Sequence, residues 1–359
     1  MKAAILNAFG TDLVIETVPD PVIGTGEVIV DVAATRVLSY SNEVFSGARN
    51  YLLDLPAIPG VGAIGRVRET GPDATHLRPG DWVVCDPTVR SRDDAVAPDI
   101  LLQGWSADGP GGLRLQQYFR HGSFAERMRV PTENVKPLGA IDPADAPSWC
   151  ALGNMLVPYG GFLAAKLQPG ETVLVSGATG NFGSAAVAVA LAMGARCVIA
   201  PGRNQSVLSD LVRRFGPRVR PVVLTGNEAD DRERMQSAAP GRIDCVLDIL
   251  PPSVSPTVVR AAAMTVRPYG RVVLMGGVGW SGAPDLELSY RWLMRNCITI
   301  MGKWMYPPEA PGKLAALVSA GLLRLDGYEI TAFGLDQANQ AVAHAAANSA
   351  PFRMTVICP

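Results

Sequence analysis

The chain has 359 residues, more than one ordinary hydrophobic core organises, so two domains are expected. Hydrophobic residues make up 48% of it and charged residues 18%, which is typical of a globular protein with a large buried fraction. The formal net charge of -1 and the lack of a basic stripe argue against nucleic acid and anionic membranes as partners. The sequence has neither a signal-like start nor an apolar run long enough to span a membrane, so we expect a cytoplasmic protein.

The first 90 residues predict short β-strands. Runs rich in β-branched residues are separated by Gly and Pro turns, at 2–9, 13–19, 26–35, 63–71 and 81–87. The segment 88–122 is polar, rich in Gly and Pro and poorly periodic, and we expect a long excursion there without being able to derive its fold. Strand patterns return over 123–138.

From about residue 170 strand and helix patterns alternate. Apolar strand patterns lie at 172–177, 196–200, 222–225, 244–250 and 270–277. Helical patterns separate them, which indicates βαβ units and a parallel sheet. Two more helices and a strand at 352–359 end the chain. The predicted fold class is α/β, with a doubly wound dinucleotide-binding domain (151–302) inserted into a β-rich domain (1–150 and 303–359).

A glycine-rich turn, "SGATGNFG", joins the first strand of this region to its helix. It matches the dinucleotide-binding pattern G-x-G-x-x-G with Ala178 in the first glycine place, followed by Gly180 and Gly183. Gly180 lets the backbone approach a pyrophosphate, and Gly183 lets the helix pack close to the strand. A plain packing turn is the alternative, but the βαβ context favours a cofactor. The predicted cofactor site also includes the remaining residues of the turn: Ser176, Thr179, Asn181 and Phe182.

The end of the next strand distinguishes NAD from NADP. An NAD site usually places an acid there to bind the ribose hydroxyls. Here the segment 200–204 reads "APGRN", with no acid before Asp210. Arg203 can clamp a 2′-phosphate through its planar guanidinium, and Asn204 follows it. We therefore predict NADPH as the cofactor, the alternative being that Arg203 is a solvated residue at the start of a helix.

With the β-rich first part, "GDWVV" at 80–84, the glycine turn and the closing strand in this order, the chain resembles the medium-chain dehydrogenase/reductase superfamily. It is most similar to the zinc-lacking, quinone-oxidoreductase-like branch. The resemblance implies a GroES-like catalytic domain, a Rossmann domain and a homodimer. It also implies that a loop beside the nicotinamide and an arginine near the phosphates belong to the cofactor site: Gly276, Gly277, Val278 and Arg353.

The ligand positions of the zinc-containing relatives can be compared one by one. Leu38 stands in place of their Gly-x-Cys cysteine, Val61 in place of their histidine and Gly153 in place of their third ligand. None of these side chains offers a ligand atom. The segment 88–122 contains no cysteine for a structural zinc, and the six cysteines of the chain are scattered. We therefore expect no metal, and reduced cysteines.

Without a metal to polarise a carbonyl, hydride transfer suits an acceptor that is already electron-poor. A proton donor is then needed near the developing enolate. Tyr40 occupies the place of the proton-relay hydroxyl in the zinc enzymes. Tyr51 lies near the tyrosine acid of zinc-lacking enoyl reductases, offset by two residues. Either tyrosine could instead be a wall residue, while Asn42 is a candidate to orient the substrate and Trp280 a candidate pocket wall.

The resulting prediction is a zinc-independent, NADPH-dependent oxidoreductase that reduces a small molecule. Its acceptor is an activated double bond, as in an α,β-unsaturated carbonyl, or a quinone. Two alternatives stay open: a metal-free carbonyl reductase or alcohol dehydrogenase, and a non-catalytic NADPH-binding protein. The sequence does not name the substrate.

Overall fold

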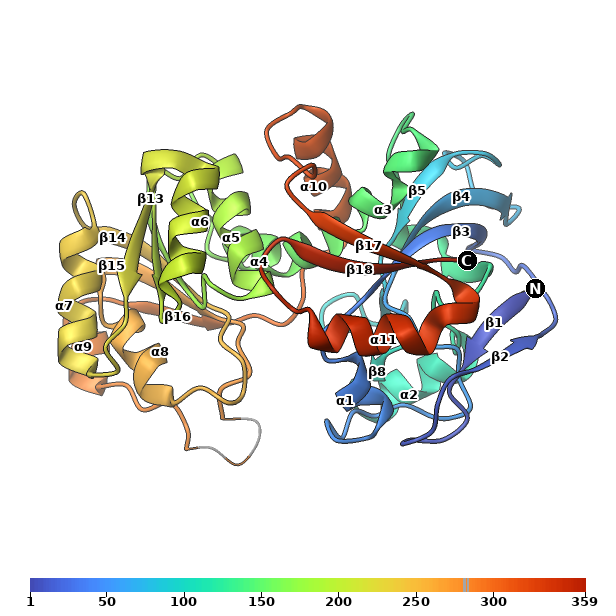
Figure 1. The fold of residues 1–359 in the computed structure, drawn as a ribbon, viewed down its shortest axis with the longest axis horizontal. Coiled ribbons are helices and arrows are strands. Elements are labelled where there is room, and N and C mark those ends of the chain that lie inside the picture. The colour runs from blue at the N-terminus through green and yellow to red at the C-terminus, as the bar shows by residue number, and fades with distance from the viewer. Residues whose placement is uncertain (280–281, 283) are drawn as a thin grey trace.

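The computed structural model describes residues 1–279, 282 and 284–359. Within these residues, most strands belong to a seven-stranded and a six-stranded sheet, and two smaller sheets have three and two strands. Figure 1 shows the two large sheets on opposite sides of α4 (Leu152–Ala164). The mixed α/β fold predicted from the alternation of strand and helix patterns is confirmed.

The six-stranded sheet is parallel throughout and has the order β13-β12-β11-β14-β15-β16. Its strands are β11 (Thr172–Ser176), β12 (Cys197–Gly202), β13 (Val219–Val223), β14 (Ile243–Asp248), β15 (Val266–Leu274) and β16 (Thr299–Gly302). The helices between them are α5 (Asn181–Ala192), α6 (Gln205–Phe215), α7 (Glu228–Ala238), α8 (Pro256–Ala263) and α9 (Tyr290–Arg295). The strand order reverses direction between β11 and β14. In doubly wound folds this reversal opens a crevice at the carboxyl ends of the strands.

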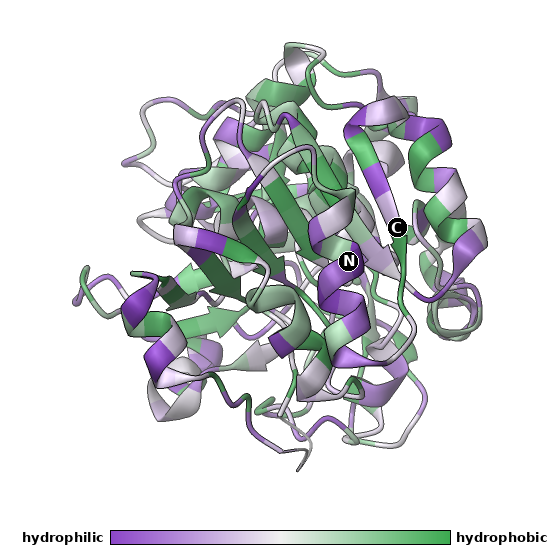
Figure 2. Ribbon diagram, turned by 90° about the vertical axis from the view of Figure 1, so that its left-hand side faces the viewer, coloured by the Kyte–Doolittle hydropathy of each residue, from purple (hydrophilic) through white to green (hydrophobic). Residues whose placement is uncertain are grey.

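The central strand of this sheet is apolar because it is covered on both faces. Every residue of β11 is buried, and α5 packs into the same core cluster as α4. Strands buried on both faces need continuous apolar runs rather than alternation. Figure 2 shows the strands largely in green, with helices of mixed colour around them. The run of apolar residues before the glycine turn is therefore a consequence of its central place.

The seven-stranded sheet joins the beginning and the end of the chain. Its order is β10-β5-β4-β3-β18-β17, with β9 also paired to β3. Its strands are β3 (Glu27–Val37), β4 (Ala63–Thr70), β5 (Trp82–Cys85), β9 (Arg127–Pro131), β10 (Val135–Pro137), β17 (Glu329–Gly334) and β18 (Arg353–Cys358). β18 pairs antiparallel with β3, and Figure 1 shows these red and blue strands side by side. This pairing is long-range, so the predicted strand patterns alone do not specify it.

The segment 88–122 forms a small lobe. It contains β6 (Thr88–Arg90), β7 (Ile100–Leu102), β8 (Ser106–Ala107) and α2 (Gly109–Tyr118). Gln103 Nε2 donates hydrogen bonds to the carbonyl oxygens of His121 at 2.8 Å and Arg129 at 2.7 Å, which ties the lobe to β9. The Ala107 amide donates to the carbonyl of Leu52 at 2.7 Å. The lobe is thereby held against the segment that follows α1 (Ser41–Phe45).

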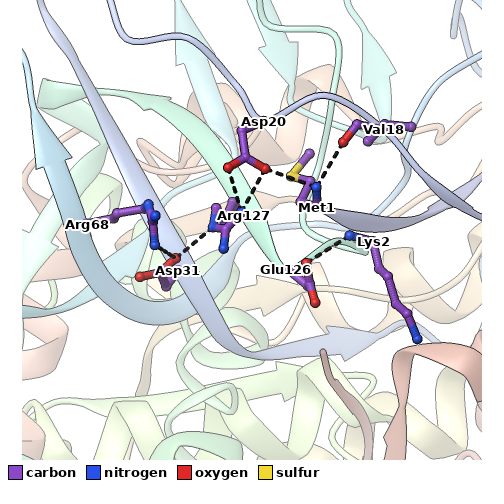
Figure 3. Close-up of polar contacts among 8 residues, drawn as sticks. All are labelled: Met1, Lys2, Val18, Asp20, Asp31, Arg68, Glu126 and Arg127. Carbon is purple, nitrogen blue, oxygen red and sulfur yellow. Dashed lines mark hydrogen bonds and ion pairs between the residues drawn. The ribbon is translucent and has the colours of Figure 1, made fainter.

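A two-stranded ribbon, β1 (Lys2–Ile5) and β2 (Val14–Thr17), precedes the large sheet. Figure 3 shows the charged contacts at its base, where Arg127 reaches Asp20 at 2.7 Å and Asp31 at 3.2 Å. The Met1 amino group donates to the same Asp20 at 3.0 Å. Because Asp20 and Asp31 are exposed to solvent, each of these contacts contributes little to the stability of the fold.

The remaining helices are short. They are α3 (Ala146–Trp149), α10 (Ala310–Ser319) and α11 (Ala338–Ala347), the last two being the helices predicted near the end of the chain. In the part of the chain that the structure describes, no helix has the length and apolar character needed to cross a membrane.

Candidate active site

A cleft of about 1670 Å³ lies between the two large sheets. On one side it is lined by residues at the carboxyl ends of β11, β12, β14 and β15. On the other side it is lined by residues that follow β3 and by the turn between β7 and β8. The carboxyl ends of parallel strands are where open α/β sheets bind ligands, so the cleft is the candidate active site.

The glycine turn forms part of the cleft wall, with the geometry that a phosphate requires. A side chain at Gly183 would overlap the Gly177 carbonyl, so only glycine allows α5 to start this close to the turn. At Gly180 the nearest atom to an added Cβ is the Gly177 oxygen at 3.4 Å, which leaves the backbone open to a ligand. No side chain caps the first turn of α5 within the described residues, so its amide groups remain available to an anion.

The structure brings most of the predicted cofactor residues together along the cleft. Those that line it are Ser176, Thr179, Gly180, Asn181, Phe182, Gly183, Arg203, Gly276, Gly277 and Arg353. Ala178 is instead fully buried beneath the turn, and Val278 is not part of the lining. The Asn204 side chain caps α6 by accepting from the Val207 amide at 3.2 Å, which gives it a structural role. The predicted pocket wall Trp280 lies outside the described residues.

Two arginines offer positive charge to an anion in this half of the cleft. Arg203 follows β12 directly and is exposed, and no acid stands beside it in the segment 200–204. Arg353 begins β18, and its Nε donates to Glu329 Oε2 at 2.9 Å. Glu329 also lines the cleft, so part of the charge of Arg353 is already neutralised. Arg203 is therefore the stronger candidate for a phosphate contact.

Asp248 is a buried acid beside the cofactor turn that sequence reasoning missed. It ends β14, pairs in register with Ser176 and is 3% exposed. Burial raises the pKa of Asp248 to about 7. A Cβ on Gly276 would lie 2.6 Å from Asp248 Oδ2, so glycine is required there for packing as well as for any ligand. The sequence feature that points to this buried acid is that Asp248 is the second acidic residue in the otherwise apolar segment 244–250.

Tyr40 and Tyr51 line the opposite half of the cleft. Burial and, after it, the neighbouring Tyr51 raise the pKa of Tyr40 to about 12. The phenol of Tyr40 is therefore protonated at physiological pH and is able to donate a proton. The ring of Trp105, from the small lobe, lies 5.8 Å from that of Tyr40 in an edge contact. Asn42 is exposed on α1 and is not part of the cleft lining, so its position does not favour the predicted role in orienting substrate.

The residues at the zinc position of the zinc-containing relatives do not fit a metal. Leu38 faces the cleft, and Val61 and Gly153 line an adjoining cavity of about 30 Å³. Two thiols, those of Cys85 and Cys150, line that cavity too, but its lining offers no third His, Cys, Asp or Glu, and a zinc site needs three or four protein ligands. Across the described residues, no group of three or more His, Cys, Asp or Glu side chains is placed to hold a metal.

A guanidinium occupies this space instead. A Cβ on Gly153 would lie 2.5 Å from Cζ of Arg36, so the arginine packs directly on the glycine backbone. Arg36 Nη1 donates to Asn154 Oδ1 at 2.7 Å. Sequence reasoning missed Arg36, although it stands in the glycine place of the Gly-x-Cys motif that Leu38 ends. The guanidinium of Arg36 therefore places a positive charge beside Gly153.

Comparisons with known proteins agree with this architecture. A family model described as "Alcohol dehydrogenase GroES-like domain" matches residues 24–140, and one described as "Zinc-binding dehydrogenase" matches 182–320. An alcohol dehydrogenase of Rhizobium meliloti is 30% identical over 279 residues, which are 77% of each chain. An acryloyl-coenzyme A reductase of Metallosphaera sedula is 27% identical over 296 residues, 81% of each chain.

A solved structure extends the likeness over the whole fold. The cobalt- and zinc-bound thermostable alcohol dehydrogenase of Pyrobaculum aerophilum is similar with a TM-score of 0.75 and 24% identity, covering 100% of this chain and 99% of that one. The likeness covers both the GroES-like region and the parallel Rossmann-like sheet of this chain. The chain is therefore an oxidoreductase of the medium-chain dehydrogenase/reductase superfamily, whose dehydrogenases use a nicotinamide cofactor.

Proposed function

We propose that this oxidoreductase uses NADPH to reduce a conjugated carbonyl or a quinone, without zinc. The observation that carries the proposal concerns the residues that stand at the zinc-ligand positions of the zinc-containing relatives. Leu38, Val61 and Gly153 supply no ligand atoms, and the Arg36 guanidinium lies where Gly153 leaves space. A simple ketone benefits more from a Lewis acid that polarises it than a conjugated acceptor does, because the conjugated acceptor spreads the developing charge through its own bonds.

The half of the cleft formed by the parallel sheet suits NADPH. When bound, the reduced nicotinamide supplies the hydride. The open backbone at Gly180 and the free amides at the start of α5 bind the pyrophosphate. Arg203 binds the 2′-phosphate, which an acid at the end of β12 would repel.

The other half of the cleft supplies the proton. As hydride reaches the β-carbon, the π electrons move onto the carbonyl oxygen and form an enolate. Tyr40 donates its phenolic proton to this enolate and recovers one from solvent. The acryloyl-coenzyme A reductase relative supports this class of acceptor, because an acryloyl group is a conjugated carbonyl.

A second candidate function is the reduction of unconjugated aldehydes or ketones. It is favoured by the relatives that are alcohol dehydrogenases. The two activities are separated by comparing NADPH consumption on enals with that on the matching saturated aldehydes, with quinones as a third group. We expect faster turnover of enals and quinones. Faster turnover of the saturated aldehydes would replace the proposal with the second candidate, and tight NADPH binding without any turnover would indicate a binding protein.

A further inference from the structure

Arg36 is a buried cation at the end of β3. It pairs with Val356 of β18 and is 9% exposed. Among the residues that the structure describes, no carboxylate lies within 4.0 Å of it, and the Asn154 amide oxygen is its hydrogen-bond acceptor. Burial lowers the pKa of Arg36, yet a guanidinium stays charged in proteins. A buried charge without a counterion is unfavourable, so this one calls for a partner that the chain alone does not provide.

The surroundings hold the guanidinium in place and leave it accessible from the cleft. Gly153 leaves room for it on α4, and Asn154, the next residue, accepts from Nη1 at 2.7 Å. A guanidinium has five N–H donors, and this hydrogen bond uses one of them. Both Arg36 and Asn154 line the large cleft, together with Leu38 and Tyr40. Fixed N–H donors in a cleft, next to a candidate proton donor, are typical of a site that stabilises an oxyanion.

We propose that Arg36 is the oxyanion-binding residue of the cleft, with its free N–H groups donating to the carbonyl oxygen of the acceptor. This inference rests on the proposed function. Hydride forms a new C–H bond at the β-carbon, the C=C π pair becomes the Cα–C π bond, and the C=O π pair moves onto oxygen. Arg36 stabilises that oxygen by hydrogen bonds and charge and gives up no proton. The proton comes from Tyr40, which keeps the two roles on separate residues.

The competing view is that Arg36 only bridges β3 and α4 through Asn154. Binding of an anion that the enzyme cannot reduce distinguishes the two roles. If Arg36 is purely structural, replacing it in a folded variant leaves the affinity for that anion unchanged. We choose formate, acetate and benzoate as probes, since a carboxylate resembles an enolate oxygen in charge and geometry. Binding is measured by calorimetry on the full chain saturated with NADP⁺.

The variants are Arg36→Met, which keeps the length and removes the charge, and Arg36→Lys, which keeps the charge and removes the planar fork. Arg214→Met is the control, since Arg214 packs on Phe352 and bonds the Gly327 carbonyl outside the cleft lining. We expect Arg36→Met to weaken carboxylate binding by about tenfold or more, Arg36→Lys to weaken it less, and Arg214→Met to leave it unchanged. NADP⁺ affinity equal to that of the wild type shows that a variant is folded.

Unchanged carboxylate binding in Arg36→Met, or no carboxylate binding by the wild type, would overturn the proposal. If Arg36→Met does not fold, Arg36→Lys decides, because equal binding by this variant would exclude recognition through the guanidinium. Turnover of enones is measured in parallel. Carboxylate binding that depends on Arg36 without turnover of any enone or quinone would reject the proposed function and retain the anion site. Enone turnover together with carboxylate binding that does not depend on Arg36 would retain the proposed function and reject the anion site.

Discussion

The guanidinium carbon of Arg49 lies 4.1 Å from the centre of the Tyr40 ring. The same guanidinium donates from Nε to Glu43 Oε2 at 2.8 Å, so it is itself held in place. A cation over an aromatic face is attracted by the ring and fixes its plane. Tyr40 thereby becomes a rigid part of the cleft wall, with a phenol whose pKa burial raises to about 12. It is the first proton donor to test.

Replacing Tyr40 with phenylalanine should lower turnover of an enone by about tenfold or more, because a positioned acid contributes roughly 10²–10⁴ in rate. The loss should be much smaller for a quinone, whose reduced oxygen is a weaker base. Steady-state rates with both substrates check this. Tyr51→Phe is the matched control, as this second tyrosine lines the same cleft. Full enone activity in Tyr40→Phe with a loss in Tyr51→Phe would transfer the role to Tyr51.

Removing the Arg203 side chain should change the affinity for NADPH and the affinity for NADH by different amounts. Arg203→Ala is expected to weaken NADPH binding by about tenfold or more and to leave NADH binding nearly unchanged, since only NADPH carries the 2′-phosphate. Fluorescence titration of each cofactor measures this. Arg353→Ala serves as comparison, because an arginine near the phosphates that both cofactors share should affect the two alike. Equal losses for both cofactors in Arg203→Ala would show that it does not bind the 2′-phosphate.

Purified protein should contain no stoichiometric zinc. Leucine, valine and glycine stand at the three ligand positions, and the guanidinium of Arg36 would repel a divalent cation next to Gly153. Elemental analysis tests the content, and incubation with a chelator should leave both turnover and the melting temperature unchanged. One zinc per chain, lost together with activity on chelation, would contradict this expectation and the zinc-independent reaction.

Replacing Asp248 with asparagine should alter the pH dependence of stability. The pKa of Asp248 is raised from 3.8 to about 7 in the fold, so the native state keeps its proton where the unfolded chain has lost it. Wild-type stability should therefore fall from about pH 4 to about pH 7, by roughly 1.4 kcal/mol for each pH unit from this group. Asparagine cannot ionise. The free energy of unfolding of the variant relative to that of the wild type should therefore rise between about pH 4 and about pH 7 and stay constant at higher pH.

Urea unfolding of the cofactor-free protein across this pH range measures the effect of Asp248→Asn. The exposed Asp12 gives a control, since Asp12→Asn removes a carboxylate that is already in water. A difference between Asp248→Asn and the wild type that does not change with pH would mean that the buried carboxyl ionises as it does in the unfolded chain.

The parts of the site that sequence reasoning found are local along the chain. The turn from Ser176 to Gly183 is contiguous, and its glycines and flanking strand and helix patterns are enough to predict a phosphate-binding backbone. Arg203 could also be predicted, because it directly follows a strand in the sequence. The fold of the segment 88–122 could not be derived, because its strands have only two or three residues and the segment is held by the carbonyls of Leu52 and Arg129, which lie outside it. The helix cap formed by Asn204 shows that proximity in sequence does not distinguish a ligand contact from a cap, and its place in the cofactor site stays a prediction.

By itself the sequence determined the order of strands and helices, the glycine turn and the lack of ligand atoms at Leu38, Val61 and Gly153, since each depends on residue type and spacing. Only the tertiary structure decided what occupies the metal position. Arg36 and Asn154 are 118 residues apart in the chain, and they meet because folding brings the end of β3 beside the first turn of α4. The burial that raises the pKa of Tyr40 and of Asp248 likewise depends on segments far along the chain. Charge and proton affinity depend on surroundings, and folding alone assembles those surroundings.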